Sequence, residues 1–159
     1  MMYVPDPHVR LSNLVVAFLS FAAVIIAVAL QAAWQLNPCS LCIAQRYFFL
    51  ALGITAVLRY ASPAAFDKGW RVIQGIIGVT GLAVAAKNVY VLVVPSPTCG
   101  RDSLAEFINE LPSAVHWPKV FEATGMCSDP IPPVAGIPFP GWSFALFLLL
   151  TIMVLRRQH

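Results

Sequence analysis

Residues 11–34, LSNLVVAFLSFAAVIIAVALQAAW, form a long apolar stretch that contains no Asp, Glu, Lys or Arg. A helix needs about 20 mostly apolar residues to cross the roughly 30 Å hydrocarbon core of a bilayer. The stretch therefore predicts a membrane-spanning helix. A secretory signal peptide is the alternative, because Arg10 precedes the stretch and residues 27–29, Ala-Val-Ala, resemble a cleavage site. The apolar run is longer than the roughly 7–15 residues of a signal core, which favours the span.

The composition of the whole chain indicates the same class of protein. Of its 159 residues, 59% are hydrophobic and only 11% are charged, which is too apolar for the surface of a soluble domain of this size. The net charge of +3 raises the question of nucleic acid, but the basic residues stand singly and form no stripe that could follow phosphates. We therefore expect a membrane protein that binds no nucleic acid.

Three further apolar stretches, residues 43–59, 72–94 and 141–155, predict three more spans. The expected fold is an all-α membrane protein, a four-transmembrane-helix bundle that forms one domain over residues 1–159. Its outer loops are expected at residues 35–42 and 95–138, the long one between the third and fourth helices. Small residues recur in the third span, where they let a neighbouring helix approach closely: Gly75, Gly78, Gly81 and Ala85.

The distribution of Lys and Arg predicts which side of the membrane each loop faces. The two tails and the connection 59–71 hold six such residues: Arg10, Arg59, Lys68, Arg71, Arg156 and Arg157. The opposite loops hold two, Arg101 and Lys119. Because positive residues favour the cytoplasmic side, both termini are expected in the cytoplasm and all four cysteines on or at the outer face of the membrane. Disulfides persist on that side.

The long loop is expected to contain two short helical pieces and an extended one. Residues 101–112, RDSLAEFINELP, predict a short helix that ends at Pro112. Residues 115–125, VHWPKVFEATG, predict a short segment lying on the membrane surface. Residues 127–141, CSDPIPPVAGIPFPG, contain five prolines and predict an extended, flexible segment.

Cys39 and Cys42 form a Cys-x-x-Cys pair at the start of the second span. A zinc site needs four ligands, and the spacing of Cys99, Cys127 and His116 is irregular, so we expect no metal. Cys42 is expected in the first helical turn, where partial positive charge favours a reactive thiolate. Arg46 lies one turn further on, on the same face, and is expected to stabilise negative charge on Cys42 or on an electron acceptor beside it.

Two simpler interpretations remain open from these residues alone. Arg46 could extend toward lipid headgroups, and the four cysteines could form two fixed structural disulfides. The three possible pairings of four cysteines are not distinguished by spacing. Against fixed disulfides stand the two-residue spacing, the position at the membrane edge and the adjacent arginine, which together suit a site that passes electrons to a quinone in the bilayer.

Four segments resemble the DsbB family, inner-membrane disulfide bond formation proteins that reoxidise the periplasmic oxidase DsbA. They are NPCSLCIAQR (37–46), YVLVVPSPTC (90–99), ELPSAVHWPKVFEATGMC (110–127) and FPGWSFALF (139–147). The resemblance implies that Cys99 and Cys127 form the pair that oxidises a DsbA-like partner, with Cys99 as the site of the mixed disulfide. It implies that Cys39 and Cys42 then reoxidise that pair through a link between Cys39 and Cys127.

The resemblance also implies that Cys42 and Arg46 face ubiquinone or menaquinone. Two positions depart from the family pattern. Gln45 stands where the family has Glu, and Asn88 stands where some members have a histidine near the quinone. Asn88 can donate a hydrogen bond but cannot carry a proton.

The expected function is a quinone-dependent thiol oxidoreductase that makes disulfides in a periplasmic thioredoxin-like partner. A quinone reductase of the vitamin K epoxide reductase type also combines four spans with a Cys-x-x-Cys pair, but there the pair lies in a late span. The alternative that is not an enzyme is a membrane scaffold with two fixed disulfides.

Overall fold

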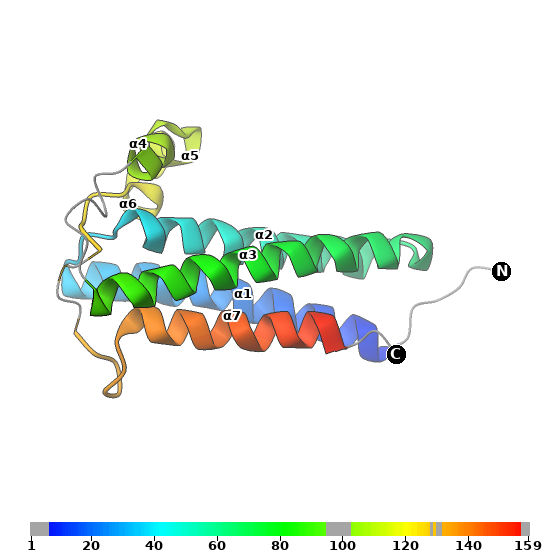
Figure 1. Ribbon diagram of the computed structural model, residues 1–159. Helices are drawn as coiled ribbons and strands as arrows, with labels where there is room; N and C mark the ends of the chain where they lie inside the picture. The colour runs from blue at the N-terminus through cyan, green and yellow to red at the C-terminus, as the bar shows by residue number, and fades with distance from the viewer. Residues whose placement is uncertain (1–6, 95–102, 128, 130–131, 157–159) are drawn as a thin grey trace.

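The protein is described by a computed structural model, which covers residues 7–94, 103–127, 129 and 132–156. Four long helices, α1 (Pro7–Trp34), α2 (Ser40–Ala61), α3 (Asp67–Val93) and α7 (Phe139–Arg156), run side by side as a bundle (Figure 1). Each is long and apolar enough to cross a membrane. The chain is thus an all-α, multi-pass membrane protein with the expected four-helix architecture.

Three short helices, α4 (Ser103–Glu110), α5 (Pro112–His116) and α6 (Pro118–Phe121), connect the third and fourth long helices. They lie together at one end of the bundle, beside the start of α2 (Figure 1). The start of α1 and the end of α7 lie at the opposite end. A single 3-10 turn, η1 (Ala64–Phe66), joins α2 to α3. The expected short helix after residue 101 is present as α4.

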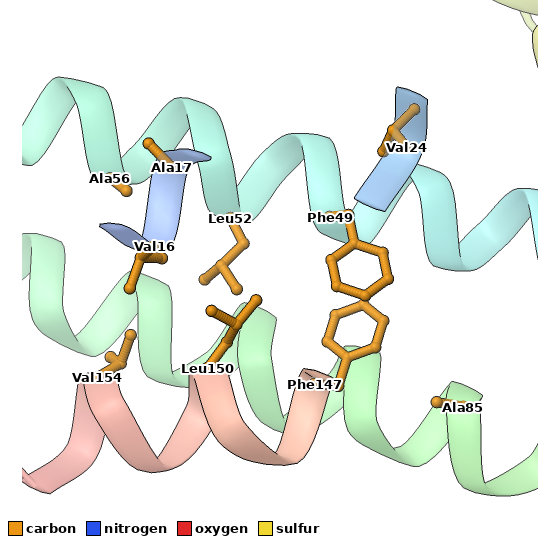
Figure 2. Close-up of a cluster of buried hydrophobic side chains, with 10 residues drawn as sticks. All are labelled: Val16, Ala17, Val24, Phe49, Leu52, Ala56, Ala85, Phe147, Leu150 and Val154. Carbon is orange, nitrogen blue, oxygen red and sulfur yellow. The ribbon is translucent and has the colours of Figure 1, made fainter. Parts of the chain in front are cut away.

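The centre of the bundle is filled by apolar side chains from all four long helices (Figure 2). Its buried members are Val16, Ala17, Val24, Phe49, Leu52, Ala56, Ala85, Phe147, Leu150 and Val154. The rings of Phe49 and Phe147 stack with their centroids 3.8 Å apart, which joins α2 to α7. Many apolar side chains on the outside, such as Phe18 and Ile76, are exposed, as expected for helices that face lipid.

The small residues of α3 lie against α7, as the sequence predicts. Gly75, Gly78, Gly81 and Ala85 are all buried. A Cβ atom added at Gly81 would overlap Cε1 of Phe147, and one added at Gly78 would lie 2.8 Å from Oγ1 of Thr151. Glycine at these positions lets the backbone of α3 approach the side chains of α7.

Replacing Gly81 with alanine is expected to destabilise the bundle by about 1–3 kcal/mol, because the new methyl group would meet the ring of Phe147, which is fully buried. Unfolding of the purified protein in detergent, followed by circular dichroism, measures the effect. Gly75→Ala is the matched control on the same helix, since its new Cβ would meet only Leu155 at an ordinary 3.5 Å. Equal midpoints for the two variants would contradict the prediction.

The structure differs from the sequence prediction at the start of the third long helix and within the segment expected to be extended. The third long helix begins at Asp67 rather than at residue 72, because Asp67 forms ion pairs with Arg59 and Arg71 that hold a polar first turn in the helix. Within the segment expected to be extended, Val134 and Ile137 exchange two backbone hydrogen bonds of 3.0 and 3.1 Å. These close a tight turn over Ala135 and Gly136, both with positive φ, so the extended prediction is wrong at this point.

Candidate active site

The Cys-x-x-Cys pair lies at the beginning of α2. Cys39 is the residue that caps the helix, and Cys42 lies in the first turn as predicted. The two sulfur atoms are 3.1 Å apart, beyond the roughly 2.05 Å of a disulfide, so both residues are thiols. The hydrogen bond that Cys39 donates to Cys42, together with burial, raises the pKa of Cys39 far above its usual range.

Cys42 lines a cavity of about 380 Å³ between α1, α2, α3 and α7. Its wall is mostly apolar and includes Ala23, Val24, Ile26, Ala27, Phe49, Phe139, Pro140, Trp142, Ala145, Leu146 and Leu149. Ile26, Trp142 and Leu149 are exposed on the outside of the bundle. The cavity is thus reached from the surface that faces lipid, and its volume suits a small-molecule ring system.

Arg46 lines the same cavity and is buried, with 5% of its surface exposed. Its guanidinium donates one hydrogen bond to the carbonyl oxygen of Val120 in α6 and another to Oε1 of Gln31 in α1. A side chain that reached lipid headgroups would be exposed, so that alternative for Arg46 does not match the structure. The arginine instead joins the second helix, the first helix and the loop beside the cavity.

Two amide side chains add polar groups to the cavity wall. Nδ2 of Asn88 donates a 3.4 Å hydrogen bond to the sulfur of Cys42, and Asn88 is almost fully buried. Gln45 is buried too, and its Nε2 has no hydrogen-bond partner among the described residues. An unsatisfied buried donor carries a free-energy cost, which a ligand with an acceptor oxygen would remove.

Cys127 is buried beside the pair and packs in one cluster with Cys39, Leu41 and Val91. It is disulfide-bonded, whereas Cys39 and Cys42 are free. Cys99, the fourth predicted cysteine, lies outside the described residues. Of the predicted site residues, the structure brings Cys39, Cys42, Arg46, Asn88 and Cys127 to one end of the bundle.

The comparisons with known proteins agree on one family. The family model "Disulfide bond formation protein DsbB" matches residues 9–156. The chain belongs to the DsbB family. A disulfide bond formation protein B of Cupriavidus metallidurans is 37% identical over 92% of this chain and 93% of its own length. Those of Cupriavidus necator and Ralstonia nicotianae are 38% and 36% identical, again over more than nine tenths of both chains.

Membership in the DsbB family confirms the resemblance and makes the chain a disulfide bond formation protein. It also decides against the vitamin K epoxide reductase type. The sequence prediction missed Gln31, which binds both Arg46 and the backbone carbonyl of Lys119. One feature of the sequence could have indicated a role for Gln31: it is the only amide side chain between residues 14 and 34.

Proposed function

We propose that this DsbB-family protein is a dithiol:quinone oxidoreductase that reoxidises a DsbA-like thiol oxidase. Electrons pass from the partner to the pair containing Cys127, then to Cys39 and Cys42, and finally to a membrane quinone. The observation that carries the proposal is the position of Cys42, a free thiol in the wall of an apolar cavity that is reached from the lipid-facing surface.

The residues around the cavity fit a quinone, either ubiquinone or menaquinone. A quinone ring is flat and apolar with two carbonyl acceptors, and the cavity wall is mostly apolar and includes buried donors. Gln45 offers an Nε2 with no partner among the described residues, and Arg46 and Asn88 would lie beside the ring. When bound, the quinone supplies an acceptor for two electrons and two protons.

The relay consists of thiol–disulfide exchanges, in each of which one S–S bond forms as another breaks. A thiolate of the partner attacks Cys99 in the loop pair and releases Cys127 as a thiolate. Cys127 attacks Cys39 of the oxidised Cys39–Cys42 disulfide, and Cys42 leaves as a thiolate. The partner's second thiol then releases Cys99, which attacks Cys127 and frees Cys39.

The loop pair is then oxidised again, and Cys39 and Cys42 are reduced. The presence of free Cys39 and Cys42 together with a disulfide-bonded Cys127 matches this stage of the relay. The pair becomes a disulfide again when it gives up two electrons and two protons in the cavity. Asn88 holds the sulfur of Cys42 at the cavity wall through its 3.4 Å hydrogen bond.

We also propose that the protein lies in a bacterial inner membrane with both termini in the cytoplasm. The surplus of Lys and Arg in the tails and in the α2–α3 connection supports this orientation. The helices α4–α6 and the cysteine end of α2 then face the periplasm, where a DsbA-like partner is found and disulfides persist.

The function is tested by reconstituting the purified protein in lipid with a reduced DsbA-like partner and with ubiquinone or menaquinone. We expect loss of quinone absorbance that depends on partner thiols, with one quinone reduced per disulfide made. Thiol trapping during turnover should capture mixed disulfides with the partner. If neither quinone is reduced and trapping gives one unchanging pattern of disulfides, the protein is a scaffold with fixed disulfides and the proposal fails.

Replacing Arg46 with lysine is expected to lower the rate of quinone reduction by about 10- to 100-fold. Lysine keeps the charge but cannot donate to Gln31 and Val120 in the fixed geometry of the guanidinium, and each such charged hydrogen bond contributes about 1.5–3 kcal/mol. Steady-state absorbance measurements in lipid give the rate. Arg71→Lys, at the other end of the bundle, is the control and should retain the rate of the unmodified protein. An unchanged rate in Arg46→Lys would remove the proposed role of Arg46.

A further inference from the structure

The backbone just before Cys127 lies directly on the backbone just before Cys39. The amides of Thr124 and Gly125 both donate 3.0 Å hydrogen bonds to the same acceptor, the carbonyl oxygen of Pro38. Pro38 is the residue immediately preceding Cys39. We call the contact of Thr124 and Gly125 with Pro38 the loop dock. It joins the long loop to the start of α2. Gly125 lies two residues before Cys127, and Pro38 lies one residue before Cys39.

The loop dock requires glycine at position 125 because there is no space for a side chain there. A Cβ atom added there would overlap the carbonyl oxygen of Asn37 and lie 2.7 Å from its carbonyl carbon. Both atoms belong to the backbone and cannot rotate away as a side chain would. The φ of Gly125 lies outside the left-handed region, so alanine could adopt this conformation if the neighbouring chain were absent. Only the close approach of residues 37 and 125 excludes a larger residue.

Hydrogen bonds also hold the residues on either side of the loop dock. The side chain of Asn109 in α4 donates a 3.0 Å hydrogen bond to the carbonyl oxygen of Ala123 and accepts a 2.8 Å bond from its amide. Beyond the dock, the amide of Met126 donates to Oδ2 of Asp129 at 2.8 Å, which closes a turn around Cys127. The chain from Ala123 to Cys127 therefore has its backbone positions defined by several independent contacts.

The loop dock bears on the positions of Cys39 and Cys127. Cys39 and Cys127 are 4% and 3% exposed and belong to one buried cluster. Holding two reacting groups together converts a bimolecular reaction into an intramolecular one, with a large gain in rate. The loop dock fixes the backbone close to both groups.

We propose that the loop dock sets Cys127 beside Cys39 for exchange between the two cysteine pairs, and that Gly125 is its positioning residue. This rests on the proposed relay, in which Cys127 reacts with Cys39, and adds the feature of the chain that brings them together. Gly125 touches no reacting atom. It acts by letting the loop backbone reach that of Asn37 and Pro38.

The test uses the full chain with Cys42→Ser and Cys99→Ser, which leaves Cys39 and Cys127 as the remaining thiols. Added diamide oxidises them to one intramolecular disulfide and takes up the two electrons and two protons released. Quenching with an alkylating agent and mass spectrometry give the rate of disulfide formation. Adding Gly125→Ala is expected to lower this rate about tenfold or more. Gly69→Ala, which has no atom within 4 Å of the new Cβ, should leave it unchanged.

Two further measurements separate positioning from a general loss of structure. The unfolding midpoint should change by less than about 2 °C in Gly125→Ala, because the dock lies outside the core of the bundle. Asn109→Ala removes both bonds to Ala123 without adding any atom near Asn37, and should also slow disulfide formation. If Gly125→Ala and Asn109→Ala both form the disulfide at the unmodified rate, the proposal is overturned.

Diamide replaces both the quinone and the protein partner in this experiment. Normal quinone reduction with unchanged disulfide rates would reject the loop dock alone. Slow disulfide formation in the variants, with no quinone reduction by the intact chain, would reject the proposed function alone.

Discussion

Cys42→Ser is expected to lower quinone reduction by a thousandfold or more, to about the background rate. Cys42 is the free thiol in the cavity wall, and serine cannot form the Cys39–Cys42 disulfide that the proposed relay requires. The rate is measured by quinone absorbance with a reduced DsbA-like partner in lipid.

The control for Cys42→Ser is the first thiol–disulfide exchange of the proposed relay, which takes place before Cys42 reacts. The variant should still exchange once with the reduced partner, because the disulfide of Cys127 does not involve Cys42. Ser143→Ala, at another position in the cavity wall, should keep most of the rate. Substantial turnover in Cys42→Ser would show that electrons leave the protein by some other group.

Asp67→Ala is expected to destabilise the folded protein by about 3–5 kcal/mol, the largest effect on stability that we predict. Asp67 accepts hydrogen bonds of 2.7 and 3.1 Å from Arg59, whose side chain is only 5% exposed, and a third from Arg71. Without the carboxylate, Arg59 keeps only its bond to Gln74 among the residues that the structure describes, and remains a buried, uncompensated cation. Unfolding midpoints in detergent measure the loss.

Arg71→Ala is the matched control for Asp67→Ala. It removes the i,i+4 partner of the same carboxylate, but Arg71 is more exposed, and such pairs contribute less than about 1 kcal/mol. Arg59 would keep both of its bonds to Asp67. If the two variants lose equal stability, the pairing of Arg59 with Asp67 is not what holds this end of the bundle together.

The four spans could be predicted because lipid imposes a simple rule of length and apolarity, which residues 11–34 satisfy clearly. The position of Cys42 in the first turn of α2 followed from Pro38 and the start of the apolar run. The small residues of α3 indicated a close helix contact, and the structure places Phe147 and Thr151 of α7 against them. These features depend on neighbours in sequence or on one repeated spacing.

The features that sequence reasoning missed depend on contacts between distant residues. Sequence reasoning counts Arg59 only as a positive charge on one side of the membrane and does not single out Asp67, although the two residues bind each other across the turn between α2 and α3. Gln31 and Val120 are 15 and 74 residues from Arg46, and no spacing rule joins them. The loop dock likewise joins residues 38 and 125 through backbone atoms, which leave no pattern of side chains in the sequence.

The stacked pair of Phe49 and Phe147 bears on how a molecule from the bilayer could enter and leave the cavity. Phe49 lines the cavity, and its ring rests on that of Phe147 at 3.8 Å in the packed centre of the bundle. On the side of Phe49 the cavity therefore borders the packed core of the bundle, with the fully buried Phe147 ring behind the Phe49 ring. If the cavity binds a quinone as proposed, the reduced molecule must leave toward the lipid-facing surface before the next oxidised one can bind, and the rate of this exchange is an upper limit on turnover.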